Sequence, residues 1–163
     1  MKKIISFALC FMILFSFASA ELSDRETKLV AMYNAIAKTL CGKTIIDKDN
    51  NQKSGNNILF TCDGIEITFQ MTASGEVDLA AIKLMDDAAA ESFLFANASM
   101  IYLLGELDYE AFGSMLMQYG QIQRDNPLFI PGMIGLDEFN IIRASDDNKV
   151  CFLYMNKDLT DNR

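Results

Sequence analysis

Alternation of apolar and polar residues in the middle of the chain constrains its fold most strongly. Between residues 65 and 71 the sequence IEITFQM places an apolar side chain at every second position. Because successive side chains of a strand point to opposite sides of a sheet, this pattern predicts a strand with one buried and one solvated face. The same period occurs on either side of it, and the dipeptide Asp63-Gly64 is a tight-turn signal. Consecutive antiparallel strands are therefore predicted at 58–62, 65–71 and 77–84.

A helix is predicted before these strands, over residues 24–40. Ser23 and Glu26 have the spacing of a capping box, in which two side chains bond the free amides of the first turn. Apolar residues then recur at helical spacing, and Gly42 is a typical stop signal. Residues 43–47 predict a further short strand, so that the region holds a meander of four strands.

Cysteine placement predicts one disulfide in this region. The polar residues 47–57 are interpreted as a hairpin loop, and a hairpin centred in its middle sets Cys41 opposite Cys62. Directly opposed strand residues have Cβ atoms about 4.5–5.5 Å apart, slightly more than the spacing in a relaxed disulfide. Cys151 is then left as an odd thiol, and the rival pairing is Cys62 with Cys151.

A second helix, over 88–107, is predicted to be apolar on nearly all sides. Asp86 or Asp87 can cap its start, and no helix breaker occurs before Gly105. A helix that is hydrophobic all round lies in the centre of a core or in an interface. A third helix is predicted at 109–121, with Phe112 and Tyr119 among the large side chains of its apolar face.

Residues 122–135 combine structure-breaking and apolar residues, because both prolines of the chain occur here beside Leu128, Phe129, Ile130 and Met133. Strands at 136–144 and 149–156 complete the chain. The predicted fold class is α+β, an antiparallel sheet (a four-strand meander plus a C-terminal hairpin) with helices packed on one face. The predicted element order is α-β-β-β-β-α-α-β-β.

The first twenty residues have the layout of a secretory signal peptide. Lys2 and Lys3 precede an apolar run, and Ala18-Ser19-Ala20 supplies small residues before a cleavage point. We therefore expect one exported domain over 21–163, periplasmic or extracellular, with no membrane insertion after the signal is removed. The apolar run is shorter than the roughly 20 residues of a spanning helix.

Charge and composition exclude several classes of function. The chain has 14 basic and 22 acidic side chains, a net charge of −8, and its two signal-peptide lysines would be lost on export. Such a surface repels nucleic-acid phosphates and anionic lipid. Histidine is absent, which excludes Ser-His or Cys-His nucleophile activation and histidine-ligated metals. No catalytic residue, metal or cofactor is assigned.

Two acidic patterns have simpler explanations than a site. Asp47, Asp49 and Asn51 match the opening of a calcium-binding loop, but Gln52 and Ile58 occupy the positions of the turn glycine and the bidentate glutamate. We interpret the stretch as a solvated loop. The scattered carboxylates fall on turns, helix caps and solvated strand faces; they are Asp63, Glu66, Asp78, Asp86 and Asp87.

Two hypotheses for function remain. The first is a binding or protein-interaction module whose apolar helix and loop surface recognises a protein, peptide or apolar ligand. Its predicted binding residues are Leu128, Phe129, Ile130, Met133, Phe112 and Tyr119. The loop either folds down as a lid on the core or presents its side chains to a partner. The alternative is a small histidine-independent enzyme that uses Asp or Glu carboxylates or a free cysteine such as Cys151.

We predict cleavage after Ala20, because its small side chain and that of Ala18 fit the recognition positions of signal peptidase. Intact-mass analysis of the protein isolated from its own host should give a chain that begins at Glu21. A mature protein that retains Met1 would contradict export.

Overall fold

The computed structural model describes residues 21–105, 133–135, 138–146 and 149–158, together with Gly113 and Met117. The predicted signal peptide, the predicted third helix and most of the proline-containing segment lie outside the described residues. The elements are α2 (Asp24–Cys41), β1 (Asn51–Ser54), β2 (Asn57–Cys62), β3 (Ile65–Met71), β4 (Val77–Leu84), the 3-10 turn η1 (Asp87–Ala89), α3 (Ala90–Leu104), β5 (Met133–Gly135), β6 (Phe139–Asp146) and β7 (Lys149–Asn156).

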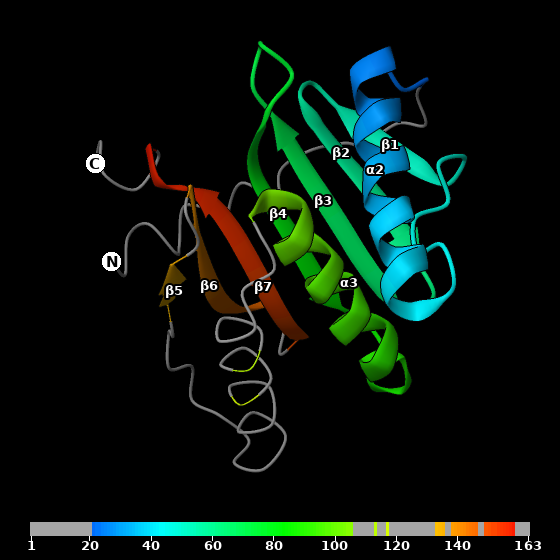
Figure 1. Ribbon diagram of the computed structural model, residues 1–163, viewed down its shortest axis with the longest axis vertical. Coiled ribbons are helices and arrows are strands. Elements are labelled where there is room, and N and C mark those ends of the chain that lie inside the picture. Colours follow the sequence, from blue (N-terminus) through cyan, green and yellow to red (C-terminus); the bar gives the residue numbers. More distant parts are fainter. Residues whose placement is uncertain are drawn as a thin grey trace.

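The predicted α+β class is confirmed. The strands form one antiparallel sheet of seven, in the order β1-β2-β3-β4-β7-β6-β5, and α2 and α3 both lie on one face of it (Figure 1). The first four strands form a meander, as predicted, although β1 lies at a different place from the predicted first strand. The C-terminal hairpin joins the meander through pairing of β7 with β4. Strand β5 was not predicted, since residues 133–135 had been assigned to the loop; it pairs with β6 at the sheet edge.

Local capping signals were reliable. The Ser23 amide donates to Glu26 Oε2 at 2.7 Å, and the Glu26 amide donates to Ser23 Oγ at 3.4 Å, which completes the predicted capping box. Gly42 ends α2 in the left-handed conformation at φ 76°. Asp86 caps the next helical segment by accepting from the Ala88 amide at 2.9 Å, although this segment begins with the 3-10 turn η1.

The predicted strand at 43–47 was wrong, and so was the extent of the loop after it. Asn34 on α2 donates to the Ile46 carbonyl at 2.7 Å and accepts from the Ile45 and Ile46 amides at 3.1 and 2.9 Å. A helix side chain therefore satisfies the backbone groups that a sheet would otherwise pair. The first strand instead lies at 51–54, inside the predicted loop.

This shift also overturns the geometry behind the predicted disulfide. In the β1–β2 hairpin Asn51 pairs with Phe60, so the turn lies at Gly55 rather than in the middle of the predicted loop. Cys41 ends α2, where its thiol lies 3.0 Å from the Ala37 carbonyl, and Cys62 is opposite Ile65. None of Cys41, Cys62 and Cys151 forms a disulfide in the structure.

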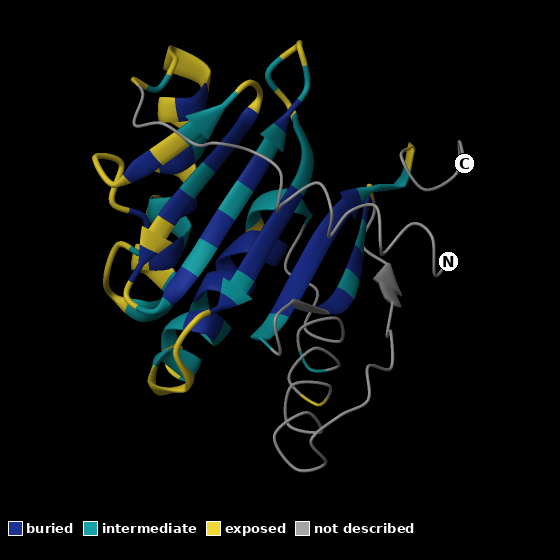
Figure 2. Ribbon diagram, turned by 180° about the vertical axis from the view of Figure 1, so that it is seen from behind, coloured by how far each residue is buried: buried dark blue, intermediate teal, exposed yellow. Residues whose placement is uncertain are grey.

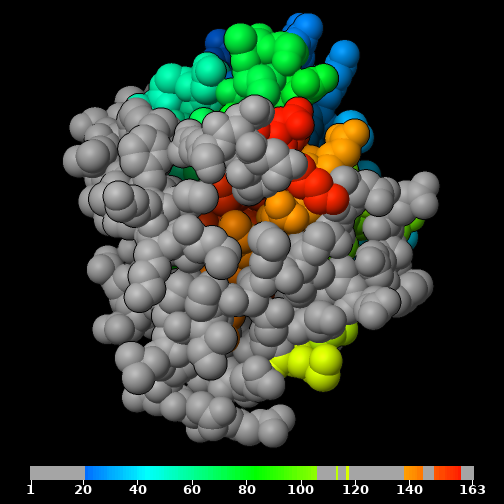
Figure 3. Space-filling view, turned by 90° about the vertical axis from the view of Figure 1, so that its left-hand side faces the viewer, coloured from blue at the N-terminus to red at the C-terminus, as the bar shows by residue number. Residues whose placement is uncertain are grey.

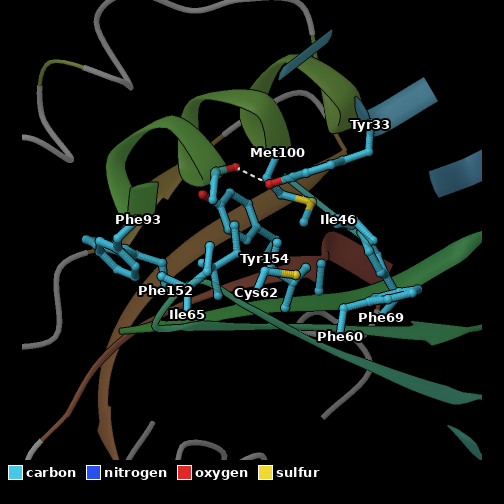
Figure 4. Packing of buried hydrophobic residues seen from close by; sticks show 14 of the residues in the cluster. Tyr33, Ile46, Phe60, Cys62, Ile65, Phe69, Phe93, Met100, Phe152 and Tyr154 are labelled. Atoms are coloured by element: carbon cyan, nitrogen blue, oxygen red, sulfur yellow. Dashed lines mark hydrogen bonds between the residues drawn. The ribbon is translucent and has the colours of Figure 1, made fainter. Parts of the chain in front are cut away.

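The main core lies between the two helices and the helix-facing side of the sheet. Tyr33 of α2 meets Phe69 of β3 edge to face, and Phe93 of α3 packs against Phe152 of β7 at a centroid distance of 5.7 Å (Figure 4). In α3 every residue from 96 to 101 is buried. This confirms that the helix predicted to be apolar all round is central to the core.

Two tyrosines cross this core and end on α3. The Tyr33 hydroxyl donates to the Ala96 carbonyl at 2.8 Å, and the Tyr154 hydroxyl donates to Asn97 Oδ1 at 2.7 Å. The Asn97 amide nitrogen in turn donates to the Phe93 carbonyl at 2.7 Å. Burial raises the pKa of both tyrosines well above its usual value, so both hydroxyls remain protonated donors.

We predict that Gly64→Ala destabilises the fold considerably more than Gly55→Ala. Both glycines have positive φ, 80° and 58°, so each change costs about 1–2 kcal/mol of backbone strain. Only at position 64 would the new Cβ meet packed atoms, 2.7 Å from the Ala89 Cβ, whereas Gly55 faces open space. Overpacking adds about 1–3 kcal/mol. Urea unfolding of the two variants measures the difference, and equal losses would contradict the contact.

Candidate functional site

The second face of the sheet, opposite the helices, is divided into a polar and an apolar half. Over β1 to β3 the residues on this face are mostly polar, as at Glu66, Thr68 and Gln70. Over β4, β7 and β6 they form a cluster that we call the rear patch. It consists of buried Ala81, Ala144, Cys151, Leu153 and Met155 with partly buried Leu79 and Ile142.

Neither described helix covers the rear patch. Figure 2 views the sheet from this side, where the dark blue of buried residues continues across β4, β7 and β6. Strand β7 is buried at every position from Cys151 to Met155, on both of its faces. An unbroken apolar run of this kind is typical of a strand that is covered on both sides, whereas α2 and α3 cover one side only.

A second apolar row continues the helix-facing side of the sheet beyond α3. Phe139, Ile141 and Arg143 lie along β6 on this side, because Ile141 and Arg143 pair with the helix-facing Tyr154 and Phe152 of β7. We call these three residues the front row of β6. Figure 3 views the molecule from the side of β5 and β6, where parts of the C-terminal strands reach the surface in orange and red.

Arg143 is the unusual member of the front row. It is 7% exposed, and burial lowers the pKa of its guanidinium from the usual value. Within the described part of the chain no carboxylate or other acceptor pairs with it. A buried charge without a partner is costly, so the position calls for an explanation.

Lys53 offers a direct comparison on the same side of the sheet. It lies at the other end, in edge strand β1, and its Nζ is 2.7 Å from Glu26 Oε1. Burial raises the pKa of Glu26, but the hydrogen bonds from Lys53 and from Ser23 outweigh that effect and lower the pKa overall. The fold thus supplies a carboxylate to the less buried of these two cations and, among the described residues, none to Arg143.

Most of the predicted binding residues fall outside the described part of the chain: Phe112, Tyr119, Leu128, Phe129 and Ile130. Met133 is the first residue of β5, and its backbone partner in β6 is Ile142. The predicted binding segment therefore ends in the edge strand β5. This strand pairs with β6, which contributes residues to both the front row and the rear patch.

The cysteines and carboxylates that a histidine-independent enzyme would use are dispersed among the described residues. Cys151 is completely buried, and burial raises the pKa of the Cys62 thiol, which disfavours the reactive thiolate. Asp63 lies in the β2–β3 turn near Asp86, whereas Asp78 is at the opposite end of β4. Burial raises the pKa of Asp78.

The stretch that resembles a calcium loop is organised by its own hydrogen bonds. Asp47 accepts from the Asp49 amide at 3.0 Å, and Asn51 donates to the Lys48 carbonyl at 2.8 Å. In the described residues no three potential metal-ligating side chains of the His, Cys, Asp or Glu type come together.

Comparison with known proteins identifies no relative. No protein-family model, curated protein or solved structure is significantly similar to this chain. None of the helices in the described ranges is long and apolar enough to cross a membrane.

Sequence reasoning missed Arg143 and the rear patch, although both left a signal. Alternation in the strand that contains Ile141 assigns Arg143 to the core-facing side, where a charge is unexpected. The apolar run 150–155 indicates a strand covered on both faces. The strand that contains Arg143 and the run 150–155 were interpreted only as the two strands of a C-terminal hairpin.

We predict that the Glu26–Lys53 pair gives the protein an acid-sensitive share of its stability. A carboxyl group whose pKa is lower in the folded than in the unfolded state stabilises the fold above its unfolded pKa. That contribution is lost as the pH falls through the folded-state value. Glu26→Gln should therefore lower the urea midpoint at neutral pH and flatten its decline below the usual glutamate pKa of 4.5.

Glu91→Gln is the matched control, because Glu91 also lies in the first turn of a helix but is exposed. Its midpoint should follow that of the unmodified protein at each pH. An identical pH profile for Glu26→Gln and Glu91→Gln would contradict a stabilising role for the pair.

Proposed function

We propose that the chain is an exported binding module that recognises a protein, a peptide or a lipophilic ligand through an apolar surface, with no catalytic role. The observation that carries this proposal is the apolar character of β6 and β7 on both faces. The described helices pack on one face only, and there α3 reaches β7 through Phe93. More apolar sheet surface is thus present than the described helices can cover.

The segment between α3 and β5 is the natural partner of this surface. It starts after Gly105 on the helix side and ends where Met133 begins the edge strand. Its sequence carries large apolar side chains, which are Phe112, Tyr119, Leu128, Phe129 and Ile130. We propose that recognition involves the apolar side chains of this segment and the β6–β7 half of the sheet, because the segment ends at Met133, which pairs with Ile142 of β6.

Rigid prolines support a binding role for the segment. Pro127 and Pro131 enclose Leu128, Phe129 and Ile130, and each proline fixes a backbone angle in the free state. Less conformational entropy is then lost when the segment orders around a partner. Loops are normally polar because their backbone faces water, so a proline-restricted apolar loop favours contact with another apolar surface.

Phe129→Ser tests whether this segment binds a partner or only closes the core. Under the binding proposal the variant should keep the melting temperature of the exported protein but bind the neutral apolar dye Nile red more weakly. Phe60→Ser is the control for a core loss, because Phe60 is completely buried in β2. Removal of a core aromatic costs about 3–5 kcal/mol.

Thermal unfolding and dye titration of both variants give the answer. A fall in melting temperature for Phe129→Ser as large as that for Phe60→Ser would show that the segment is a structural lid. That result, or the absence of saturable Nile red binding to the unmodified protein, would contradict the proposed recognition through this segment.

A further inference from the structure

We propose that the apolar run of the predicted signal segment, residues 4–17, covers the rear patch, and that cleavage after Ala20 uncovers it. The occupant of the patch is thus a part of this chain that lies outside the described residues. The inference rests on the proposed function and deepens it, because it names the event that opens the β6–β7 half of the sheet to a partner.

The rear patch is covered by this chain although neither described helix lies over it. Cys151 is 0% exposed and Leu153 is 1% exposed, yet α2 and α3 both pack on the other face of the sheet (Figure 2). Over the polar half of the same face, Thr61 of β2 is exposed. Uncovered positions on this face therefore stay in contact with water, as in a sheet that is packed on one side only. The cover of the rear patch must come from outside the described ranges.

The start of α2 places the predicted signal segment near one end of the rear patch. Arg25, in the first turn of α2, lies against Gly75 in the β3–β4 turn. This turn leads into β4, where Leu79 is the first member of the rear patch and pairs with Met155 of β7, another member. The chain that precedes Ser23 therefore begins close to the end of the patch that Leu79 and Met155 form.

The segment is long enough to reach the patch and to cover it. Residues 18–22 span up to about 17 Å when extended, more than the roughly 10 Å between packed layers. The patch extends over three strands, about 10 Å across, and over about 13 Å along β4. Residues 4–17 measure about 21 Å as a helix and about 46 Å when extended. Either conformation is therefore sufficient.

Side-chain sizes in the segment and in the patch are complementary. Phe7, Phe11 and Phe15 recur every four residues, so a helix over this run presents them on one face. The rear patch has small side chains on its two outer strands, Ala81 on β4 and Ala144 on β6. Large residues that face small ones give close packing between two apolar surfaces.

Charge and connectivity favour this segment over the other long apolar stretch outside the described residues. The predicted signal segment carries Lys2 and Lys3 and no acidic residue, whereas residues 21–163 carry 12 basic and 22 acidic side chains, a net charge of −10. Opposite charges attract the segment to the rest of the chain. The other stretch leaves α3 at Gly105 on the helix-facing side and returns at β5, which is a less direct route to the second face.

Cleavage changes the state of the rear patch by removing a tether. A signal peptidase adds water across the peptide bond between Ala20 and Glu21, which leaves a carboxylate on Ala20 and an amine on Glu21. The segment is then held by noncovalent contacts alone, and its effective concentration at the patch falls. The apolar residues of the second face become accessible in the form of the protein for which we propose recognition.

Maleimide labelling of Cys151 tests the proposal, with Cys62 as an internal control. Both thiols are buried, but Cys151 belongs to the rear patch and Cys62 to the core beneath the helices. Chain 1–163, made by synthesis without membranes, and chain 21–163 are labelled with N-ethylmaleimide as monomers, and each cysteine is quantified by peptide mapping.

Cys151 should react at least about tenfold faster in chain 21–163, because labelling of a covered thiol requires local opening. Cys62 should react at the same rate in both chains. Equal rates at Cys151 would overturn the proposal. An equal acceleration of Cys62 would overturn it as well, since it would show a general loosening of the fold.

A synthetic peptide of residues 1–20 keeps the test decisive if chain 1–163 aggregates. Added to chain 21–163, this peptide should slow the labelling of Cys151. The same peptide with Phe7→Ser, Phe11→Ser and Phe15→Ser retains both lysines and should give no protection. Equal protection by the two peptides would show that charge alone attracts the segment, and would contradict an apolar contact.

Two variants of chain 21–163 locate the contact. Ala81→Lys introduces a charge into the rear patch and should abolish protection by the peptide. Thr61→Lys introduces the same charge on the polar half of the same face and should leave protection intact. Protection that survives Ala81→Lys would place the peptide elsewhere and would end the proposal.

The outcomes separate this inference from the proposed function. If Cys151 becomes reactive in chain 21–163 but this chain does not bind Nile red, the inference holds and the proposed function fails. If chain 21–163 binds Nile red while Cys151 is equally protected in both chains, only the inference fails.

Discussion

The hydrogen bonds that two buried tyrosines make to α3 determine how the rest of the molecule fits together. A helix with apolar side chains on every side can rotate or slide in an apolar core without losing much hydrophobic contact. Tyr33 fixes it from α2 through the Ala96 carbonyl, and Tyr154 fixes it from β7 through Asn97. Because an unpaired buried hydroxyl is costly, these bonds favour one register of α3 over its neighbours.

Fixing α3 in this way decides which part of the apolar sheet surface is in contact with a described helix. The helix is held over β4 and β7 by Phe93 and Asn97. The front row of β6 therefore continues the same face of the sheet beyond the helix, and the rear patch lies on the opposite face. The two halves of the sheet therefore differ: the β1–β3 half has a mostly polar second face, and the β6–β7 half has mostly apolar residues on both faces.

The parts of the fold that depend on local chemistry were predictable from the sequence. The capping box at Ser23, the stop at Gly42 and the turn at Gly64 each act within a few residues, and alternation in β3 needs no distant partner. The segment 43–54 was wrong because Asn34, on a different element, bonds the backbone of Ile45 and Ile46. Periodic patterns in a sequence do not predict hydrogen bonds between a helix side chain and the backbone of a later segment.

The same limit applies to the candidate site. Apolar residues such as Phe129 mark a segment as unusual, but only the sheet order shows which surface its end adjoins. In the order β4-β7-β6-β5, strand β5 is the edge strand and pairs with β6, so the segment that precedes β5 ends beside β6. Arg143 was visible in the sequence as a charge out of phase with its strand. Its meaning required the contrast with Lys53, which shows that this fold can supply a carboxylate to a cation on the same face.

Stability alone does not explain the arginine at position 143. If stability alone had shaped the β6–β7 half, an apolar residue at position 143 would pack beside Phe152 without the cost of burying a charge. The core elsewhere follows that rule, since the helix-facing positions of β3 are all apolar. A cation kept at this one position, on the apolar surface next to the edge strand, is the kind of local exception that marks functional sites in otherwise consistent folds.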